Sequence, residues 1–358
     1  MTESETLLEV ENLTTTFDTD AGPLIAVDGI DFTVDEGETV CIVGESGSGK
    51  TVATESITRI VKEPPGHIEG LVNFKGTDLL SLSPSQIRNV RGNNIAHIFQ
   101  NPQEAMNHCF PVGWQIVEAL QVHQDVSDDE ARKRAIDLLE RVGIANASSR
   151  FDDYPHQFSG GQKQRIMIAM ALITNPDLLI ADEPTTALDV TVQAQILRLL
   201  NDLQDEFNMG ILFVTHDLGV VAEIADRVIV MYAGKIMERG SVYDIFEQPS
   251  HPYTQELMKC LPGRGSSVEG IPGELPDPTN PPDGCRFAPR CEHAVEDCTV
   301  GDQPMEVDIG NGHKVSCIYY RRGMDSDVVR DKALEQSVNT QTQTSSDTQH
   351  TDIGETDD

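Results

Sequence analysis

The stretch 44–51, GESGSGKT, constrains the fold of this chain more than any other feature of its sequence. It follows an apolar run, 40–43 (VCIV), and it leads into residues 50–60, which lack Gly and Pro and read as a helix. A strand, a glycine-rich loop and a helix in that order form the P-loop pattern G-x4-G-K-[ST], in which backbone N–H groups converge on phosphate oxygens. The pattern predicts a nucleotide-phosphate site formed by Gly44, Glu45, Ser46, Gly47, Ser48, Gly49, Lys50 and Thr51.

A carboxylate pair at the end of a second apolar run completes the expected chemistry. Residues 178–183, LLIADE, read as a buried strand that ends in Asp182 and Glu183. In a P-loop protein, Lys50 reaches the β- and γ-phosphates and the Thr51 hydroxyl holds Mg²⁺, to which Asp182 adds a carboxylate. Glu183 is then placed to polarise an attacking water as a general base. Two adjacent carboxylates could also be mere surface charge, but together with the P-loop they predict hydrolysis of a nucleoside triphosphate.

A second glycine pair predicts a second phosphate contact. Residues 158–162, FSGGQ, stand directly before a stretch that reads as a helix. There Ser159, Gly160, Gly161 and Gln162 would form an anion site at a helix N-terminus without any lysine. Because one chain has no need of two γ-phosphate sites, this one indicates contact with a nucleotide held by another subunit.

Strands and helices alternate along the chain, which predicts an α/β fold around a parallel sheet. The most clearly marked helix is 127–142, because Ser127 can cap it, acidic residues fill its first turn and Gly143 can end it. The stretch 103–170 is expected to be a helical insertion. Other elements are expected at 94–100 (strand), 160–174 (helix), 177–182 (strand), 190–206 (helix), 210–215 (strand) and 227–239 (two strands).

Over residues 5–260 these motifs resemble the ATPase subunit of ATP-binding-cassette (ABC) transporters, a family of P-loop NTPases. GESGSGKT resembles the Walker A motif, LLIADE the Walker B motif and FSGGQ the signature motif, with Phe158 where the family usually has Leu. TTALD at 185–189 resembles the D-loop, Gln100 the Q-loop glutamine and His216 the switch histidine. The resemblance implies a parallel-sheet core, an antiparallel β subdomain and an inserted helical subdomain, joined here to a small Cys-rich C-terminal extension.

The resemblance also implies how the site works. Two ATPase subunits enclose two ATP molecules, each between the P-loop of one subunit and the signature motif of the other, so the signature residues would act in trans. His216 would contact the γ-phosphate, Gln100 would bind Mg²⁺ and couple the site to membrane subunits, and Asp189 would be the D-loop aspartate. Phe17 occupies the position at which the family stacks an aromatic ring on adenine.

Two flanking stretches carry a more particular resemblance. Residues 154–161, YPHQFSGG, and 251–254, HPYT, resemble segments of dipeptide, oligopeptide and nickel importer ATPases, although HCF at 108–110 is unusual for them. This implies an ATPase that energises peptide uptake with ATP and Mg²⁺. The implied partners are a second ABC ATPase subunit, two transmembrane permease subunits and an extracytoplasmic solute-binding protein. The alternatives are import of nickel or another solute, and a soluble ABC ATPase that acts on nucleic acid or ribosomes.

Four of the seven cysteines fall in one C-terminal stretch, in the order Cys285-x5-Cys291-x6-Cys298-x18-Cys317. Four thiols in a Pro- and Gly-rich setting suggest a metal that staples the segment. The spacing lacks the close cysteine pairs of most zinc sites, whereas four-cysteine iron–sulfur sites accept looser spacing. The surrounding residues resemble the tail of dipeptide-importer ATPases, which implies a [4Fe-4S] cluster. Zinc, free thiols, and a tail that senses redox state or iron are the alternatives.

The charge of the chain excludes one class of partner. Its 358 residues include 59 Asp and Glu against 26 Lys and Arg, a formal net charge of −33. The sequence has no basic stripe for a nucleic-acid backbone. The acidic residues are spread along the chain, which favours adaptation to a high-salt cytosol over an acidic face for a basic partner.

The sequence predicts a location at the cytoplasmic face of the membrane, reached through partners. Its acidic first residues lack the features of a signal peptide. The longest apolar run, 166–173, is far shorter than the roughly 20 residues of a membrane span.

Three parts are expected along the chain. Residues 5–250 form the nucleotide-binding domain, and 251–320 form the extension with the four cysteines. Residues 321–358, without apolar periodicity, form a disordered acidic and polar tail. The Pro- and Gly-rich residues 261–284 read as a linker.

Overall fold

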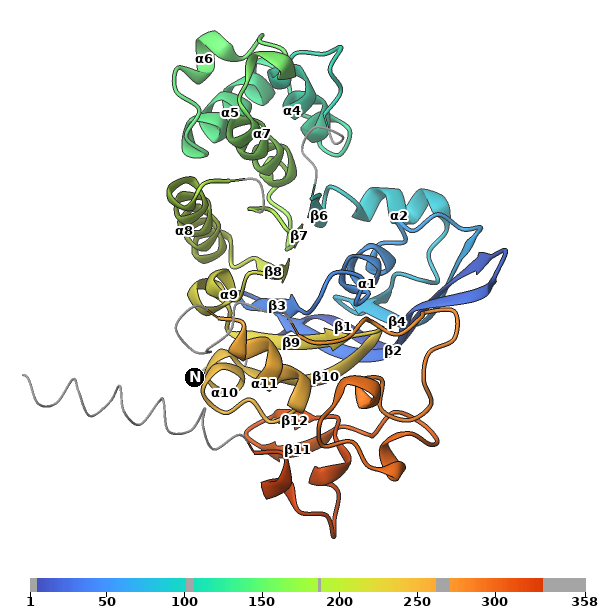
Figure 1. Cartoon of the computed structure of the whole chain (residues 1–358). Coiled ribbons are helices and arrows are strands. Elements are labelled where there is room, and N and C mark those ends of the chain that lie inside the picture. The colour runs from blue at the N-terminus through green and yellow to red at the C-terminus, as the bar shows by residue number, and fades with distance from the viewer. Residues whose placement is uncertain (1–4, 101–105, 186–187, 262–270, 331–358) are drawn as a thin grey trace, which may run out of the picture. The chain divides into compact units, whose positions relative to one another are not determined.

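The computed structural model describes residues 5–100, 106–185, 188–261 and 271–330 (Figure 1). These divide into two compact units, residues up to 236 with 275–281, and residues 237–274 with 282 onward. The expected boundary near residue 250 is therefore later in the chain than the observed one. The reason is that strand β10 (Lys235–Ser241) pairs with β12 (His313–Val315), so residues before 250 pack with the C-terminal part.

A parallel sheet forms the centre of the first unit, as the alternation of strands and helices predicts. Its strand order is β9-β3-β8-β7-β6, and every pairing in it is parallel. The strands β3, β7 and β8 are buried at every residue, which explains their unbroken apolar sequences. The strands are β3 (Thr39–Val43), β6 (Ile95–Ile98), β7 (Leu178–Asp182), β8 (Gly210–Val214) and β9 (Arg227–Tyr232).

A separate antiparallel sheet has the order β2-β1-β4-β5, which confirms the antiparallel subdomain. Its buried face shares one hydrophobic core with the parallel sheet and helix α1 (Lys50–Ile57), and Leu8, Val34 and Ile42 belong to that core. This joint core holds the P-loop, which connects β3 to α1, in a fixed place. The strands are β1 (Thr6–Thr19), β2 (Gly22–Asp35), β4 (Gly66–Phe74) and β5 (Thr77–Asp78).

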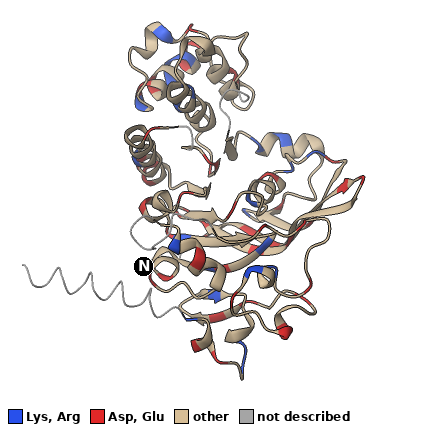
Figure 2. Ribbon diagram, viewed as in Figure 1, with Lys and Arg blue, Asp and Glu red and all other residues tan. Residues whose placement is uncertain are grey.

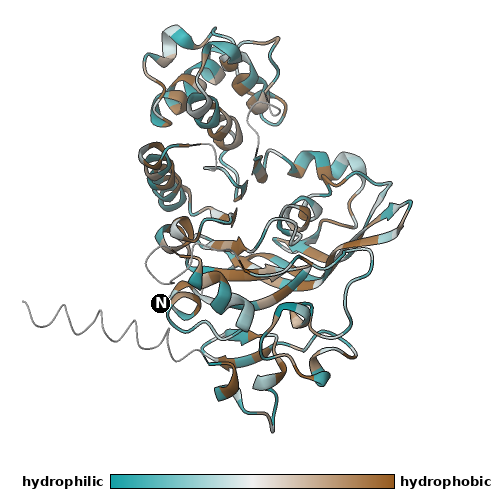
Figure 3. Cartoon of the chain, viewed as in Figure 1, coloured by the Kyte–Doolittle hydropathy of each residue, from teal (hydrophilic) through white to brown (hydrophobic). Residues whose placement is uncertain are grey.

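The helical insertion is confirmed. Helix α5 begins as its sequence predicts, because the Ser127 side chain accepts a hydrogen bond from the Glu130 N–H at 3.3 Å, and Gly143 follows with φ +79°. Outside the insertion, hydrophilic and hydrophobic residues share helix α8 (Val190–Phe207), as expected for a helix with one buried face (Figure 3). The insertion contains α4 (Val112–Gln121), α5 (Asp128–Arg141), α6 (Ala147–Arg150) and α7 (Gly160–Leu172). The core also carries α2 (Pro84–Val90), α8 (Val190–Phe207) and α9 (Leu218–Ile224).

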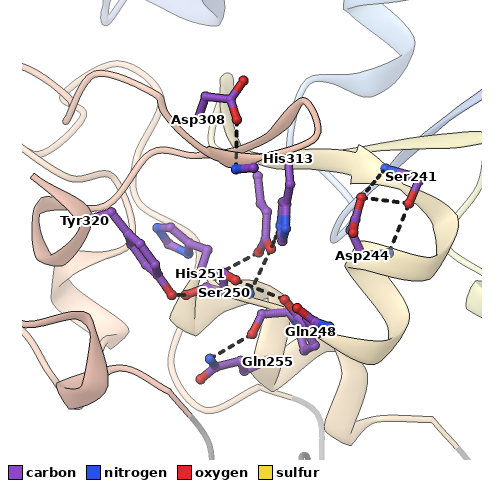
Figure 4. Close-up of polar contacts among 12 residues, drawn as sticks. Ser241, Asp244, Gln248, Ser250, His251, Gln255, Asp308, His313 and Tyr320 are labelled. Atoms are coloured by element: carbon purple, nitrogen blue, oxygen red, sulfur yellow. Dashed lines mark hydrogen bonds and ion pairs between the residues drawn. The ribbon is translucent and has the colours of Figure 1, made fainter.

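The second unit is built around a buried carboxylate. Glu238, with no exposed surface, accepts hydrogen bonds from the N–H groups of Ser250 and His251, each at 2.8 Å. It also contacts His313 Nε2 at 2.7 Å (Figure 4). These contacts join β10, the start of α11 (Pro252–Lys259) and β12, so residues far apart in sequence form one polar core. The unit also contains α10 (Val242–Glu247), β11 (Val307–Gly310) and the short helices η2 (Ala288–Arg290), η3 (Glu296–Cys298), η4 (Ile318–Tyr320) and η5 (Ser326–Val328).

Residues 321–330, which the sequence assigned to a disordered tail, are part of the described structure. Residues up to 330 are described, and they include η5 and the fully buried Val329, whose carbonyl accepts a hydrogen bond from Gln255 Nε2 at 2.8 Å. The remainder of that prediction, 331–358, lies outside the described residues. Within the described ranges, no helix is both long and apolar enough to cross a membrane.

Candidate active site

Two glycines of the P-loop, Gly44 and Gly49, lie where a side chain would collide with neighbouring backbone. Gly44, Gly47 and Gly49 have φ values of +150°, +82° and +98°. A Cβ atom on Gly44 would lie 2.1 Å from the carbonyl oxygen of Met231, and one on Gly49 would lie 2.3 Å from that of Ala26. Only glycine satisfies both the backbone angles and the space, so the loop is built for close approach of its backbone to a ligand.

Lys50 begins helix α1 and folds back beneath the loop. Its ammonium donates to the carbonyl oxygens of Gly44 and Glu45, both at 2.9 Å. Burial lowers the pKa of Lys50, whereas the nearby carboxylates of Glu183 and Asp182 act to raise it. The positive charge is thus held inside the loop that is expected to receive the phosphates.

Asp182, at the carboxyl end of β7, fits a divalent cation. It is buried, and its Oδ1 atom has no hydrogen-bond partner. Burial raises the pKa of Asp182, and a hydrogen bond with Thr51 partly opposes that rise. A buried carboxylate oxygen without a partner is costly unless a cation or donor joins it, and Mg²⁺ prefers oxygen ligands of this kind. Asp182 and Thr51 therefore fit the Mg²⁺ site that the sequence predicts.

Glu183 is held between two polar side chains from neighbouring strand ends. Its Oε2 accepts from Gln100 Nε2 at 2.9 Å, and its Oε1 lies 2.9 Å from His216 Nδ1. Gln100 follows β6, Glu183 follows β7 and His216 follows β8, so the parallel sheet brings them to one edge. The backbone of Glu183 has φ +46°, a conformation that is uncommon outside glycine and that concentrates at functional sites. The structure thus brings together three residues that the sequence selects from separate motifs.

One pocket is lined both by the P-loop and by two of these residues, Gln100 and Glu183. It is lined by Gly47, Gly49, Lys50, Thr51, Gln100 and Glu183, and also by residues that no motif indicated. Those additional residues are Leu24, Ile25, Ala26, Val52, Ala233, Gly234, Leu275, Pro276, Asp277, Pro278 and Pro281. No signal in the sequence marked 275–281, which reads there only as part of a linker.

Phe17 is not among the described residues that line this pocket. It pairs with Leu24 and Gly66 in the antiparallel sheet, and a Cβ atom on Gly66 would lie 3.3 Å from its ring. Its predicted stacking on adenine stays a prediction.

The signature residues lie outside the pocket of their own chain. Ser159 caps α7: its hydroxyl accepts from the Gln162 N–H at 3.3 Å, and the Gln162 side chain accepts from the Ser159 N–H at 3.1 Å. Asp189 caps α8 by accepting from the Val192 N–H at 3.0 Å. Each helix N-terminus therefore has one satisfied cap and further N–H groups that a ligand could engage.

The four C-terminal cysteines line a single cavity in the second unit, together with His251 and Tyr319. Burial raises the pKa of the Cys285 and Cys291 thiols to about 11 and that of Cys317 to about 12. Backbone N–H groups of Phe287, His293 and Tyr319 are directed to these sulfur atoms and oppose the rise.

His251 also lines this cavity. Its Nδ1 accepts from the Tyr253 N–H at 3.0 Å, so the proton of the neutral ring is on Nε2. Burial lowers the pKa of His251 to about 3, and a backbone hydrogen bond with Ser316 partly opposes that fall. Within the described residues, no three His, Cys, Asp or Glu side chains are close enough to hold a single metal ion as they stand. Four cysteine thiolates are also the usual donor set of an iron–sulfur cluster.

Comparison with known proteins identifies the class of this site. Residues 27–186 match the ABC transporter family, and residues 237–298 match the family described as oligopeptide/dipeptide transporter, C-terminal region. The oligopeptide transport ATP-binding protein AppD of Bacillus subtilis is 48% identical over 88% of this chain and 97% of its own length. The oligopeptide transport ATP-binding protein OppD of the same organism is 52% identical over 81% of this chain and 82% of its own.

Solved structures agree with the fold. The dimeric ABC transporter cassette MJ0796 matches with a TM-score of 0.60 and 29% identity, over 66% of this chain and 99% of that one. A second structure of MJ0796, in a post-hydrolysis state bound to ADP and Pi, matches equally well. The fold and the site together define an ABC-type ATPase core. The chain belongs to the ABC transporter family, in the group whose members carry the oligopeptide/dipeptide transporter C-terminal region.

Proposed function

We propose that this chain is the ATP-hydrolysing subunit of a peptide importer and acts at the cytoplasmic face of the membrane. The observation that carries the proposal is the placement of Glu183 between Gln100 and His216 at the P-loop pocket, in a chain that also has the peptide-transporter C-terminal region. The names of its relatives, both oligopeptide transport ATP-binding proteins, support peptide as the solute.

The described residues have distinct parts in hydrolysis. The P-loop N–H groups and Lys50 bind the phosphates. Thr51 and Asp182 would hold Mg²⁺, which would neutralise charge on the phosphates. Glu183 accepts a proton from the attacking water, and His216 orients Glu183 and reaches the γ-phosphate. The signature residues of a second ATPase subunit close the site, since those of this chain lie outside its own pocket.

A groove beside the Q-loop supports contact with permease subunits. It is lined by residues of β6 and of the helical insertion, including His97, Phe99, Phe110, Trp114 and Val122. The rings of Phe110 and Trp114 stack with centroids 4.4 Å apart, yet each is about 40% exposed. Exposed aromatic side chains around a groove are typical of a protein interface. Phe99 lines the groove, and the next residue, Gln100, lines the ATP pocket. A partner bound in the groove could therefore respond to the nucleotide through Gln100.

Affinity purification of the Glu183→Gln variant from solubilised native membranes with Mg·ATP tests this proposal. Recovery of permease subunits, a second ATPase and a peptide-binding protein is expected. Recovery of ribosomes or nucleic-acid enzymes, with no membrane protein, would contradict it. The Lys50→Ala variant is the matched control, because it should not be held in the ATP-bound state.

We also propose that Cys285, Cys291, Cys298 and Cys317 hold a [4Fe-4S] cluster. The cavity that the four cysteines share and the backbone N–H groups directed at three of their sulfur atoms support it. Anaerobically purified protein is expected to contain equimolar iron and acid-labile sulfide, and Cys291→Ser should lose both. Cys109→Ser is the control, because Cys109 is exposed and lies far from the four C-terminal cysteines in the sequence. Finding zinc in place of iron, or no metal, would contradict the assignment of a [4Fe-4S] cluster.

We propose that the acidic surface is an adaptation to concentrated salt. Acidic residues are found throughout the described chain (Figure 2), and the sequence has 59 of them against 26 basic residues. Their mutual repulsion is screened as the Debye length falls from about 10 Å at 0.1 M salt to about 3 Å at 1 M. The unfolding temperature is expected to rise as KCl is raised over that range. A protein that is fully folded and active in dilute buffer would contradict this.

A further inference from the structure

The stretch 275–281, LPDPTNP, lies at the nucleotide pocket although it comes from the C-terminal part of the sequence. It packs with the nucleotide-binding unit, whereas the residues before and after it belong to the second unit. Leu275, Pro276, Asp277, Pro278 and Pro281 line the pocket with the P-loop. None of the motifs that define the ATPase core includes them.

This stretch is held in place by its own hydrogen bonds. The Pro278 carbonyl accepts from the Ile25 N–H of β2 at 3.0 Å, which ties the stretch to the antiparallel sheet. Asp277 Oδ1 accepts from both the N–H and the hydroxyl of Thr279, at 2.8 and 2.7 Å. The N–H of Asn280 donates to the Asp277 carbonyl at 3.1 Å. With three prolines that restrict the backbone, the stretch is ordered before a ligand arrives, so binding costs little entropy.

Apart from the exposed carboxylate of Asp277, the surface that it presents is apolar. Prolines have no N–H group, and the N–H groups of Thr279 and Asn280 are already used within the stretch. Leu275 reaches the P-loop, since a Cβ atom on Gly47 would lie 3.7 Å from its Cδ1. Leu24, Ile25 and Ala26 of β2 line the same pocket. The P-loop and the residues at the strand ends serve the phosphates, which leaves Leu275, the prolines and the β2 residues for a flat, weakly polar group.

We propose that residues 275–281 form one wall of the base-binding part of the nucleotide site, with Leu275 packing on the purine of ATP. This inference rests on the proposed function, because it takes the P-loop pocket to bind ATP. It gives the peptide-transporter C-terminal region a direct part in nucleotide binding. It also assigns to Leu275 and the prolines a contact that the family resemblance assigns to Phe17, which is not among the described lining residues.

The test compares a ligand that has a base with one that has none. Full-length wild type and Leu275→Ala are titrated calorimetrically with Mg·ATP and with Mg·tripolyphosphate. Leu275→Ala is expected to weaken ATP binding about tenfold, because about 0.8 kcal/mol is lost for each CH₂ that the purine no longer covers. Tripolyphosphate affinity should not change. Leu275→Met, which keeps an apolar side chain of similar size, should restore ATP affinity.

The outcomes separate this inference from the proposed function. Leu275 is only half-buried, so its replacement should leave the unfolding temperature unchanged, and Met305→Ala, at an 80% exposed position, serves as the neutral control. Equal ATP affinity in wild type and Leu275→Ala overturns the base wall, and so does an equal loss for both ligands, which would place the effect at the P-loop. If Lys50→Ala weakened the binding of neither ligand, the assignment of this pocket as the nucleotide site would instead be wrong.

Discussion

Glu183→Gln is expected to lower ATP turnover by about 10²–10⁴-fold, the contribution usual for a general base, while ATP affinity changes little. The carboxylate accepts a hydrogen bond from Gln100 and lies against His216, so it is oriented toward the pocket before the nucleotide binds. An amide of the same shape fills that space but cannot take a proton from water. Phosphate release at saturating Mg·ATP, measured beside ATP affinity, separates the two quantities.

The control for this substitution is Glu223→Gln, an exposed glutamate on α9 that contacts none of the site residues described above. It should keep wild-type turnover. If Glu183→Gln itself retains turnover within tenfold of the wild type, the general base is another group and the assignment is wrong.

Ser159→Asp is expected to reduce turnover by about 10²-fold or more without weakening the binding of ATP to the isolated subunit. Aspartate caps a helix as well as serine, so α7 keeps its N-terminal cap. Its negative charge, however, would repel the γ-phosphate of the partner's nucleotide, and a phosphate contact of the transition state is worth 10²–10³-fold. Turnover and ATP affinity are measured on the same preparation.

Two comparisons complete the Ser159 experiment. Ser159→Asn, a neutral cap, should lose less activity than Ser159→Asp. Loss of ATP affinity in the isolated Ser159→Asp subunit would show that the signature acts on its own chain's nucleotide, against the in-trans assignment. If two copies of this chain pair, mixing Ser159→Asp with Lys50→Ala should recover part of the turnover, because one of the two sites is then intact.

Local features of the fold were predictable because neighbouring residues produce them. Helix α5 begins at a Ser127 cap and ends before Gly143, as their side-chain and backbone preferences require. The strands β3, β7 and β8 are short apolar runs buried at each residue, as periodicity indicates. The P-loop is specified by three glycines whose φ values only glycine adopts readily.

The residues of the candidate site were predictable from the sequence, but the hydrogen bonds among them were not. Family motifs selected Gln100, Asp182, Glu183 and His216, and the parallel sheet explains why they meet, since the ends of neighbouring strands share one edge. That Asp182 has an unpartnered oxygen, and that Glu183 already bridges two side chains, depended on side-chain positions that no motif states.

The sequence by itself determined the class of this protein, because its phosphate-binding and carboxylate motifs are short segments whose chemistry depends on adjacent residues. Only the tertiary structure decided which distant segments join them. It placed Leu275 and the prolines beside the P-loop, drew four widely spaced cysteines to one cavity, and put the unit boundary before Met237. Contacts between residues so far apart in the chain depend on the tertiary fold of the whole backbone. A local pattern of residue types does not specify that fold.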